Sequence, residues 1–245
     1  MADAPLIPRD ASGAVAPFCD AAGGFLPLLC TLNCAAVAAE ARAAHGLSTE
    51  DAEAAAFASL SARAAASPSS AASAASAASA LLFLPYLIGE RTPNWPTSTG
   101  ALIGLRPGSL GDKGAVYLAA VEGAILSLRA GYDRLIAGGV RNARRLLLVG
   151  GCAASGLWRR IACDAFALPV VVSSEPEAAA RGAAVCAAAV ATRETVKSCA
   201  TRLAPAEQGD MLLPDAASAA FYLALLKRFT LASEALYGVG TLSTS

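Results

Sequence analysis

Between residues 145 and 191 the sequence alternates between strand-like and helix-like segments, and this alternation limits the choice of folds more than any other feature. Two short apolar runs, RLLLV at 145–149 and PVVVSS at 169–174, have the length and composition of buried strands. A helical segment follows each run, over 155–166 and 175–191. Strands that alternate with helices predict an α/β domain whose parallel strands are buried on both faces.

Other parts of the chain show further elements. Helical spacing of apolar residues covers 26–44 and 113–137, and a last helix is expected over 214–237. Ser48 precedes an acidic turn and predicts the N-cap of one more helix. The apolar run at 81–87 predicts another strand or extended segment.

Two segments are expected to lie outside the packed domain, which we place at residues 18–240. Residues 1–17 are punctuated by proline and glycine and are expected to be loose. Residues 61–80, SARAAASPSSAASAASAASA, repeat alanine and serine with a period of three. Because that period matches no packed face, we expect a solvated low-complexity insertion.

The composition excludes several classes of protein. Hydrophobic residues make up 56% of the 245-residue chain, but alanine supplies much of this share, and charged residues interrupt every apolar stretch before about 18 residues. The N-terminus has no basic start followed by an apolar run, and 19 basic residues balance 19 acidic ones. We therefore expect no membrane span, no secretory signal and no nucleic-acid or lipid partner.

Cysteine and histidine usage bears on chemistry and location. The seven cysteines are scattered through apolar context with no Cys-x-x-Cys pair, and His45 is the only histidine. A metal site would need clustered ligands, and triad-type catalysis would need a histidine beside a nucleophile. The sequence therefore predicts free thiols in a reducing, cytoplasmic compartment, without a metal site or histidine-based catalysis.

The turn Gly150-Gly151 connects the strand at 145–149 to the helix that starts near Ser155. Ligands of open α/β sheets bind at the carboxyl ends of strands. Glycine there allows close approach to a ribose or phosphate, and the helix N-terminus offers free N–H groups to anionic oxygens. By spacing alone, this pattern is either a nucleotide-binding turn or an ordinary tight turn.

Longer stretches of sequence carry a family resemblance. The chain resembles the C-terminal domain of the FGGY carbohydrate kinases from about Val15 to Phe229, and within that family it is most similar to the xylulokinases. The stretches that carry the resemblance, in chain order, are FLPYLIGERTP (83–93), GALIGL (100–105), AAVEGAILSLRAGYDRLIAGG (119–139), LLLVGGCAASGLWRRIACDAFALPVVV (146–172) and EAAARGAAVCAA (177–188).

The resemblance implies the actin-like, ribonuclease H-like ATPase fold, in which two domains close on ATP and sugar. In the family the glycine turn packs against adenosine, so Gly150, Gly151 and Cys152 are the expected contacts. Cys152 stands where the family usually has a third glycine, and Gly156 stands where relatives often carry a polar side chain that can reach adenine. These departures predict weaker or backbone-only ATP binding. Ser155 lies in the same expected site.

Residues beside the turn and in the GERTP segment complete the expected site. Trp158 is either a core residue or a lid over the purine, and Asp164 is expected to be a structural anchor. Arg91 and Thr92 lie in a loop that resembles the family's loop near the domain interface, where a guanidinium could reach phosphate. The alternative for Arg91 is an arginine–glutamate pair that holds the loop. Glu122 is expected to be a helix-packing hydrogen-bond partner rather than a catalyst.

Some parts of the family's machinery have no match in this sequence. The catalytic aspartate, the first phosphate loop and most sugar contacts come from the family's N-terminal part, so no catalytic residue is expected here. ATP and Mg²⁺ are the implied cofactors, with the metal held together with the missing half. The first two strands of the sheet are also unmatched, which predicts an incomplete sheet with an open strand edge.

Two interpretations of function follow from this resemblance. In the first, the chain is the C-terminal part of an enzyme that phosphorylates D-xylulose to D-xylulose 5-phosphate. It is then either a piece of a longer chain or a product that pairs with a separate N-terminal chain, and it binds sugar only with the N-terminal domain. In the second, it is a non-catalytic remnant that binds nucleotide or a partner. Under either interpretation we expect the chain alone to be inactive as a kinase.

Overall fold

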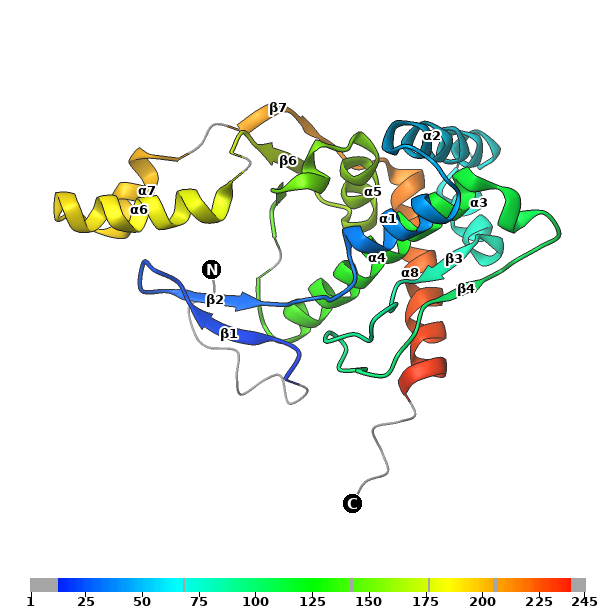
Figure 1. Cartoon of the computed structure of the whole chain (residues 1–245), viewed down its shortest axis with the longest axis horizontal. Coiled ribbons are helices and arrows are strands. Elements are labelled where there is room, and N and C mark those ends of the chain that lie inside the picture. The colour runs from blue at the N-terminus through cyan, green and yellow to red at the C-terminus, as the bar shows by residue number, and fades with distance from the viewer. Residues whose placement is uncertain (1–12, 68, 142, 176, 205–206, 239–245) are drawn as a thin grey trace, which may run out of the picture.

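A 25-residue helix, α4 (Lys113–Ala137), forms the centre of the computed structural model, which describes residues 13–67, 69–141, 143–175, 177–204 and 207–238 (Figure 1). Asp112 caps its first turn by accepting a hydrogen bond from the N–H of Ala115. Four other helices pack on α4: α1 (Ala35–Ala44), α2 (Thr49–Ala66), α5 (Gly156–Phe166) and α8 (Ala216–Tyr237). The arrangement buries most of α4 and organises a single main core around it.

Small residues let the helices and strands approach α4 closely. Ala52 and Ala56 of α2 and Ala120 and Ala124 of α4 are fully buried. At Gly123, a Cβ atom would stand 2.2 Å from the carbonyl oxygen of Phe83, so the strand passes directly over the α4 backbone. The buried alanines and Gly123 therefore allow close packing between the backbones of these elements.

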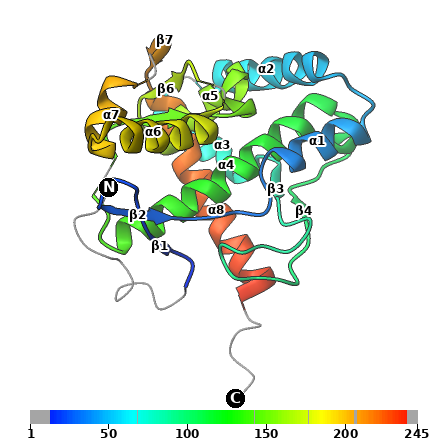
Figure 2. The same ribbon diagram turned by 60° about the vertical axis from the view of Figure 1, so that its left-hand side comes forward.

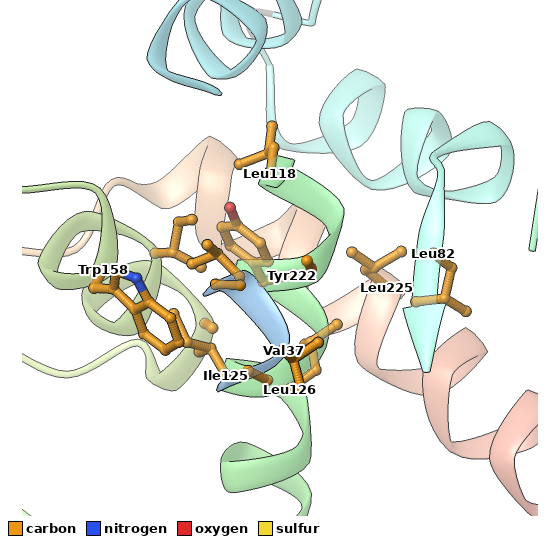
Figure 3. Close-up of a cluster of buried hydrophobic side chains, with 14 of the residues drawn as sticks. Val37, Leu82, Leu118, Ile125, Leu126, Trp158, Tyr222 and Leu225 are labelled. Atoms are coloured by element: carbon orange, nitrogen blue, oxygen red, sulfur yellow. The ribbon is translucent and has the colours of Figure 1, made fainter. Parts of the chain in front are cut away.

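Larger apolar side chains fill the spaces between these elements. Figure 3 shows Val37, Leu82, Ile125, Trp158 and Tyr222 in one buried cluster that joins α1, α4, α5, α8 and the strand containing Leu82. Since each element contributes to the same cluster, α5 and the turn before it are held by the main core.

Three small sheets accompany the helices. The hairpin β1 (Ala16–Cys19) and β2 (Phe25–Leu28) is antiparallel, as is the pair β3 (Leu82–Leu84) and β4 (Ala101–Ile103). The third sheet has the order β5–β6–β7, with β5 (Leu146–Leu148) parallel to β6 (Val170–Ser173) and β7 (Glu207–Leu212) antiparallel to β6. The remaining short elements are α3 (Ser70–Ser76), α6 (Ala178–Thr192), α7 (Val196–Arg202), and the 3₁₀ turns η2 (Ala77–Ser79), η3 (Ser109–Gly111) and η4 (Gly151–Ala154).

Many predicted elements are confirmed. The helix over 113–137 has the expected bounds, and Ser48 accepts the N–H of Asp51 as the N-cap of α2. The strand within 81–87 and the strand–helix alternation over 145–191 are also present. The last helix starts at Ala216, with Asp215 as its N-cap, and ends at Tyr237.

The helix predicted over 26–44 is wrong in its first part, because it begins only at Ala35. Leu26 and Pro27 belong to β2, where Leu26 faces Phe18 across the hairpin. Proline lacks an N–H and favours extended backbone in the residue before it, which suits an exposed hairpin strand better than a helix interior.

The solvated insertion predicted at 61–80 is also wrong. Residues up to Ala66 continue α2, and α3 with η2 packs against α8. Ser69 caps α3, while Ser73 and Ala77 are buried one helical turn apart. The small side chains on this face form the contact with α8, and they carry too little hydrophobic contrast to reveal it in the sequence.

The prediction of parallel strands buried on both faces holds for β6 but not for β5. Val170 and Val171 are buried, whereas Leu147 of β5 is 54% exposed and Val149, just after the strand, is 49% exposed. Within the described residues β5 pairs only with β6, so its other edge is open. The expected loose segment 1–17 lies mostly outside the described residues, and its last two residues, Ala16 and Pro17, start β1.

The helices α6 and α7 pack mainly on each other and extend to one side of the helical body in Figure 1. Figure 2 brings that side forward. Val190 of α6 is 81% exposed. By length and composition α4 is the one helix in the described ranges that could cross a membrane, but most of it is buried inside the structure, as in the core helix of a globular domain.

The close approach at Gly123 leads to a stability prediction. We expect Gly123→Ala to lower the free energy of unfolding by roughly 1–3 kcal/mol, because the new methyl group would collide with the Phe83 carbonyl. The matched control is Gly182→Ala in α6, where a Cβ atom meets nothing within 4 Å and helix propensity favours alanine. Urea unfolding followed by circular dichroism measures the free energy of unfolding of both variants. An equal change in the two variants would contradict the close packing at Gly123.

Candidate functional site

The turn after β5 presents an open backbone surface. Gly150 has φ 81° and ψ −172°, a conformation that is essentially restricted to glycine. A Cβ atom at Gly150 or Gly151 would meet nothing within 4 Å, so the space beside the turn is free for a ligand. The predicted glycine turn is therefore present at the carboxyl end of β5, where η4 and then α5 follow.

Some backbone N–H groups of the turn donate hydrogen bonds within the chain, and others do not. Ala153 donates to Gly150 O at 3.0 Å, and Ser155 donates to Cys152 O at 3.2 Å. In the part of the chain that the structure describes, the N–H groups of Gly151 and Cys152 have no hydrogen-bond partner. These two groups can therefore donate to an anionic or hydroxyl oxygen of a bound molecule.

Cys152 lies beside the start of α1. Its thiol is half-buried, and burial, followed by the nearby Cys34, raises its pKa. Burial also raises the pKa of Cys34, which is the N-cap residue of α1 and makes no side-chain capping bond. Both thiols are therefore protonated at neutral pH, and their interaction places the N-cap residue of α1 near the glycine turn.

Ser155 and Trp158 stabilise the start of α5, the helix that follows the turn. The Ser155 hydroxyl accepts the N–H of Trp158 at 3.3 Å and so caps α5. Trp158 is only 7% exposed and points into the core beside Val37 and Ile125 (Figure 3). Of the two roles considered for Trp158, the structure places it in the core and not as a lid above the turn.

A pocket of 350 Å³ opens at the first turn of α5. Its wall includes Phe57, Gly156, Arg159 and Val172. A Cβ atom at Gly156 would touch the Phe57 ring at 3.5 Å, which is ordinary contact, so Gly156 leaves this part of the ring uncovered. The pocket combines a ring suited to stacking with an arginine suited to phosphate.

Asp164 anchors α5 to the start of α8. Arg160 donates to both of its carboxylate oxygens, and the N–H of Asp215 donates at 2.8 Å. Burial raises the pKa of Asp164, while these donors oppose the rise. Every charge in this group has a partner, so the prediction that Asp164 is a structural anchor is confirmed.

Glu122 is held in a second buried network. Arg63 donates to it at 2.6 Å and the Tyr222 hydroxyl donates at 2.9 Å. The Arg63 guanidinium also stacks over Phe221 at 3.9 Å. Burial and the Glu122 carboxylate raise the pKa of Tyr222, which keeps its phenol protonated. The prediction that Glu122 joins helices is confirmed, because the network connects α2, α4 and α8.

Glu90 holds the GERTP loop, but not through the guanidinium of Arg91. Its Oε1 accepts the N–H groups of Leu32 at 2.8 Å and of Arg91 at 2.7 Å, and its Oε2 accepts from Asn33 Nδ2 at 3.1 Å. Asn33 also donates to Gly89 O at 2.6 Å. The loop is therefore tied to the segment just before α1, and the proposed arginine–glutamate pair is absent from the described contacts.

The two predicted loop residues, Arg91 and Thr92, differ in exposure to solvent. The Arg91 side chain is exposed and free to reach outside the chain. Thr92 is 1% exposed, and its hydroxyl points away from solvent. Neither residue meets the glycine turn, so the predicted site residues form two separate groups, one at Gly150–Trp158 and one at Arg91–Thr92.

Three residues beside the glycine turn or the GERTP loop were not predicted from the sequence. Cys34, Asn33 and Phe57 lie far from the glycine turn in sequence, and the first two fall inside a segment predicted as mid-helix. The only usable signal was Pro27, which argues for a helix start after it. Among the described residues no group of three histidine, cysteine, aspartate or glutamate side chains is arranged to hold a metal ion.

Comparisons with known proteins give a consistent result. The profile of the FGGY family of carbohydrate kinases, C-terminal domain, matches residues 7–191. A xylulose kinase from Streptomyces rubiginosus is 35% identical over 195 residues, which is 80% of this chain and 35% of that protein. A gluconokinase from Bacillus licheniformis is 36% identical over 106 residues, which is 43% of this chain and 20% of that protein.

A solved structure is similar as well. The crystal structure of xylulose kinase from Bifidobacterium adolescentis superimposes with a TM-score of 0.66 and 30% identity, covering 89% of this chain and 39% of that one. The chain thus spans 35% of the length of the Streptomyces xylulose kinase and 39% of the chain in this crystal structure.

Proposed function

Because the chain belongs to the FGGY family of carbohydrate kinases, we propose that it is the nucleotide-binding part of an ATP-dependent sugar kinase. The expected C-terminal half of the actin-like, ribonuclease H-like ATPase fold is confirmed by the family profile and the structural match. The observation that carries the proposal is the open turn at Gly150-Gly151, with two unpaired N–H groups beside the N-terminus of α1.

The turn would hold ATP mainly through its backbone. Gly150 and Gly151 leave room for a ribose, and the N–H groups of Gly151 and Cys152 would donate to its oxygens or to phosphate. The adenine would enter the pocket at Gly156, where Phe57 offers a stacking surface. Ser155 and Trp158 would act indirectly, by capping and supporting α5.

Mg²⁺ would arrive with the nucleotide. When bound, it would offset the negative charge of the phosphate groups. Within the described ranges the buried carboxylates Glu90, Glu122 and Asp164 are all engaged by hydrogen-bond donors, and no acidic cluster supplies further ligands. The remaining metal ligands would therefore come from another part of the enzyme.

For the complete enzyme we propose transfer of phosphate from ATP to D-xylulose, giving D-xylulose 5-phosphate in the cytoplasm. The similarity to a xylulose kinase over 80% of this chain supports this substrate more than the shorter gluconokinase match. The base that takes the hydroxyl proton and most sugar contacts would come from an N-terminal domain. Arg91, exposed on its loop, and the open edge of β5 are available for contact with that domain.

A second candidate is a non-catalytic protein that binds nucleotide or a partner. Cys152 and Gly156 favour it, because one adds a thiol beside the expected nucleoside and the other removes a polar contact to adenine. The first candidate requires nucleotide binding and the second allows it, so catalysis is the property that separates them.

Nucleotide binding can be tested on the whole chain. We expect MgATP to bind, and we expect Gly150→Ala to weaken binding at least tenfold, because alanine disfavours the backbone conformation that opens the turn. The control is Gly108→Ala, since Gly108 also has a positive φ, at 89°, and open space around it, but lies away from the turn. Isothermal titration calorimetry measures all three proteins. Absence of binding, or equal loss in both variants, would refute this site.

Catalysis can be tested by complementation. We expect the chain alone to release no ADP with D-xylulose, and we expect D-xylulose-dependent release when it is mixed with the N-terminal half of the Streptomyces rubiginosus xylulose kinase. D-gluconate serves as the alternative substrate. Activity of the chain alone would overturn the requirement for a second part, and ATP binding without any complemented activity would favour the non-catalytic candidate.

A further inference from the structure

A second pocket, of 280 Å³, lies between α2, α3, α5 and the first turns of α8. It shares Phe57 and Arg160 with the pocket at Gly156 and no other lining residue, so the two pockets are neighbours on the surface. Its volume is just below the range of about 300–1,000 Å³ that is typical of sites for drug-sized ligands. The pocket therefore suits a smaller molecule.

Arg63 of α2 presents unused donors to this pocket. Its charge is matched by Glu122, to which Nη2 donates, but its Nε and Nη1 donate to none of the described residues. The Arg63 side chain is 20% exposed, and its guanidinium carbon lies 3.9 Å from the centre of the Phe221 ring. Because the bond to Glu122 and the stacking hold the guanidinium in place, its free edge can receive a carboxylate with little loss of side-chain freedom.

A buried hydroxyl adds to the polar lining. Ser73 of α3 is 6% exposed and lines the pocket. Its Oγ has no hydrogen-bond partner within the described ranges. A hydroxyl in such a place is normally paired, so a ligand oxygen or an ordered water is the expected partner.

Asp215 supplies a negative charge at the start of α8. Its exposed carboxylate accepts the N–H of Ser218 at 2.8 Å, and this hydrogen bond lowers the pKa of Asp215, so that it is ionised at neutral pH. Arg160, which also lines the pocket, donates to Asp164 instead. Among the described residues no lysine or arginine forms an ion pair with Asp215. The carboxylate is therefore open to a cationic group of a ligand.

The spacing of these two groups limits what can bridge them. Arg63 lies beside Phe221, and Asp215 precedes Phe221 by nearly two turns of α8, or about 9 Å along the helix axis. Two hydrogen bonds of about 2.9 Å to a bridging ligand leave about 3 Å between its anionic and cationic groups. An α-amino acid carries its carboxylate and its ammonium group on one carbon atom, at a separation of that size.

One wall of the pocket is apolar. Phe57, Leu60 and Ala64 lie on one face of α2 at helical spacing, and all three line the pocket. Phe57 is 36% exposed, so part of its ring is uncovered. An aliphatic or aromatic side chain of a ligand would cover this wall and remove its apolar surface from water.

The other charges of the pocket cancel in pairs. Glu122 matches Arg63 at 2.6 Å, and Asp164 is paired with Arg160. An anion without an ammonium group would have to approach Asp215 uncompensated, and a cation without a carboxylate would leave the free edge of Arg63 unused. The arrangement therefore favours a ligand with both charges and no net charge.

We propose that this pocket binds a free α-amino acid with an apolar side chain. Its carboxylate accepts from Arg63, its ammonium group donates to Asp215, and its side chain packs on Phe57 and Leu60. The proposal does not depend on nucleotide binding at the glycine turn, because Arg63 and Asp215 line only this pocket of the two.

Binding is measured by saturation-transfer NMR titrations of the full chain without nucleotide. The probes are L-phenylalanine and L-leucine. Three compounds each lack one feature of the expected ligand: hydrocinnamate has no ammonium group, phenethylamine has no carboxylate, and glycine has no apolar side chain. We expect at least one probe to bind saturably, and we expect each of the three comparison compounds to bind at least tenfold more weakly than that probe.

Variants then test the two charged contacts. Asp215→Asn keeps a side-chain acceptor for the helix cap and removes the charge, so it should weaken binding of the amino acid at least tenfold without weakening that of hydrocinnamate. The matched control is Asp112→Asn, because Asp112 caps α4 in the same way, outside the pocket, and should bind as the parent does. Arg63→Lys keeps the charge beside Glu122 but loses the free guanidinium edge, and should also weaken binding at least tenfold. Circular dichroism reports whether each variant is folded.

Four results would overturn the proposal. If neither amino acid binds, the pocket holds water only. If hydrocinnamate or phenethylamine binds as tightly as the amino acid, the site recognises a single charge. If folded Asp215→Asn binds the amino acid as tightly as the parent, its ammonium group is not held by Asp215. If Asp112→Asn loses as much affinity as Asp215→Asn, the loss comes from weaker helix caps and not from the pocket.

Discussion

Two glycines of α4 allow its backbone to touch the backbones of α2 and β3. Gly114 and Gly123 have no side chain, and a Cβ atom at either would stand within 2.6 Å of a carbonyl oxygen on the adjoining segment. Through these contacts α4 fixes β3 and α2, and through the buried cluster it also fixes α5. The glycine turn is therefore positioned by helix packing and not by a large sheet.

This architecture explains why the candidate site works through backbone atoms. The buried charged groups, Glu122 with Arg63 and Asp164 with Arg160, are saturated by one another and by hydrogen bonds that join helices. They are therefore committed to structure and are not available for proton transfer. What the turn offers is space, N–H donors and an adjoining aromatic pocket. Under the proposed function, these properties would suit nucleotide binding and would leave the reacting groups to another part of the enzyme.

The sequence predicted the elements that have strong contrast between apolar and polar positions. The bounds of α4 and α8 followed closely from the spacing of apolar residues, and in the structure Asp112 and Asp215 cap the two helices. The packed helix α3 was missed because alanine and serine differ too little in hydrophobicity to mark a buried face. The start of α1 was misplaced because its true anchor, Asn33 bonded to Glu90, joins residues 57 positions apart. The glycine turn itself was predictable from its motif, whereas the neighbouring Cys34 and Phe57 depend on tertiary packing.

Hydrogen–deuterium exchange of the full chain with and without MgATP locates a bound nucleotide on the backbone. If the nucleotide binds at the glycine turn, exchange slows at 150–158 and at the first turn of α1, with little change in α6 and α7. Protection confined to other segments, or no protection at saturating MgATP, would contradict a nucleotide site at the glycine turn.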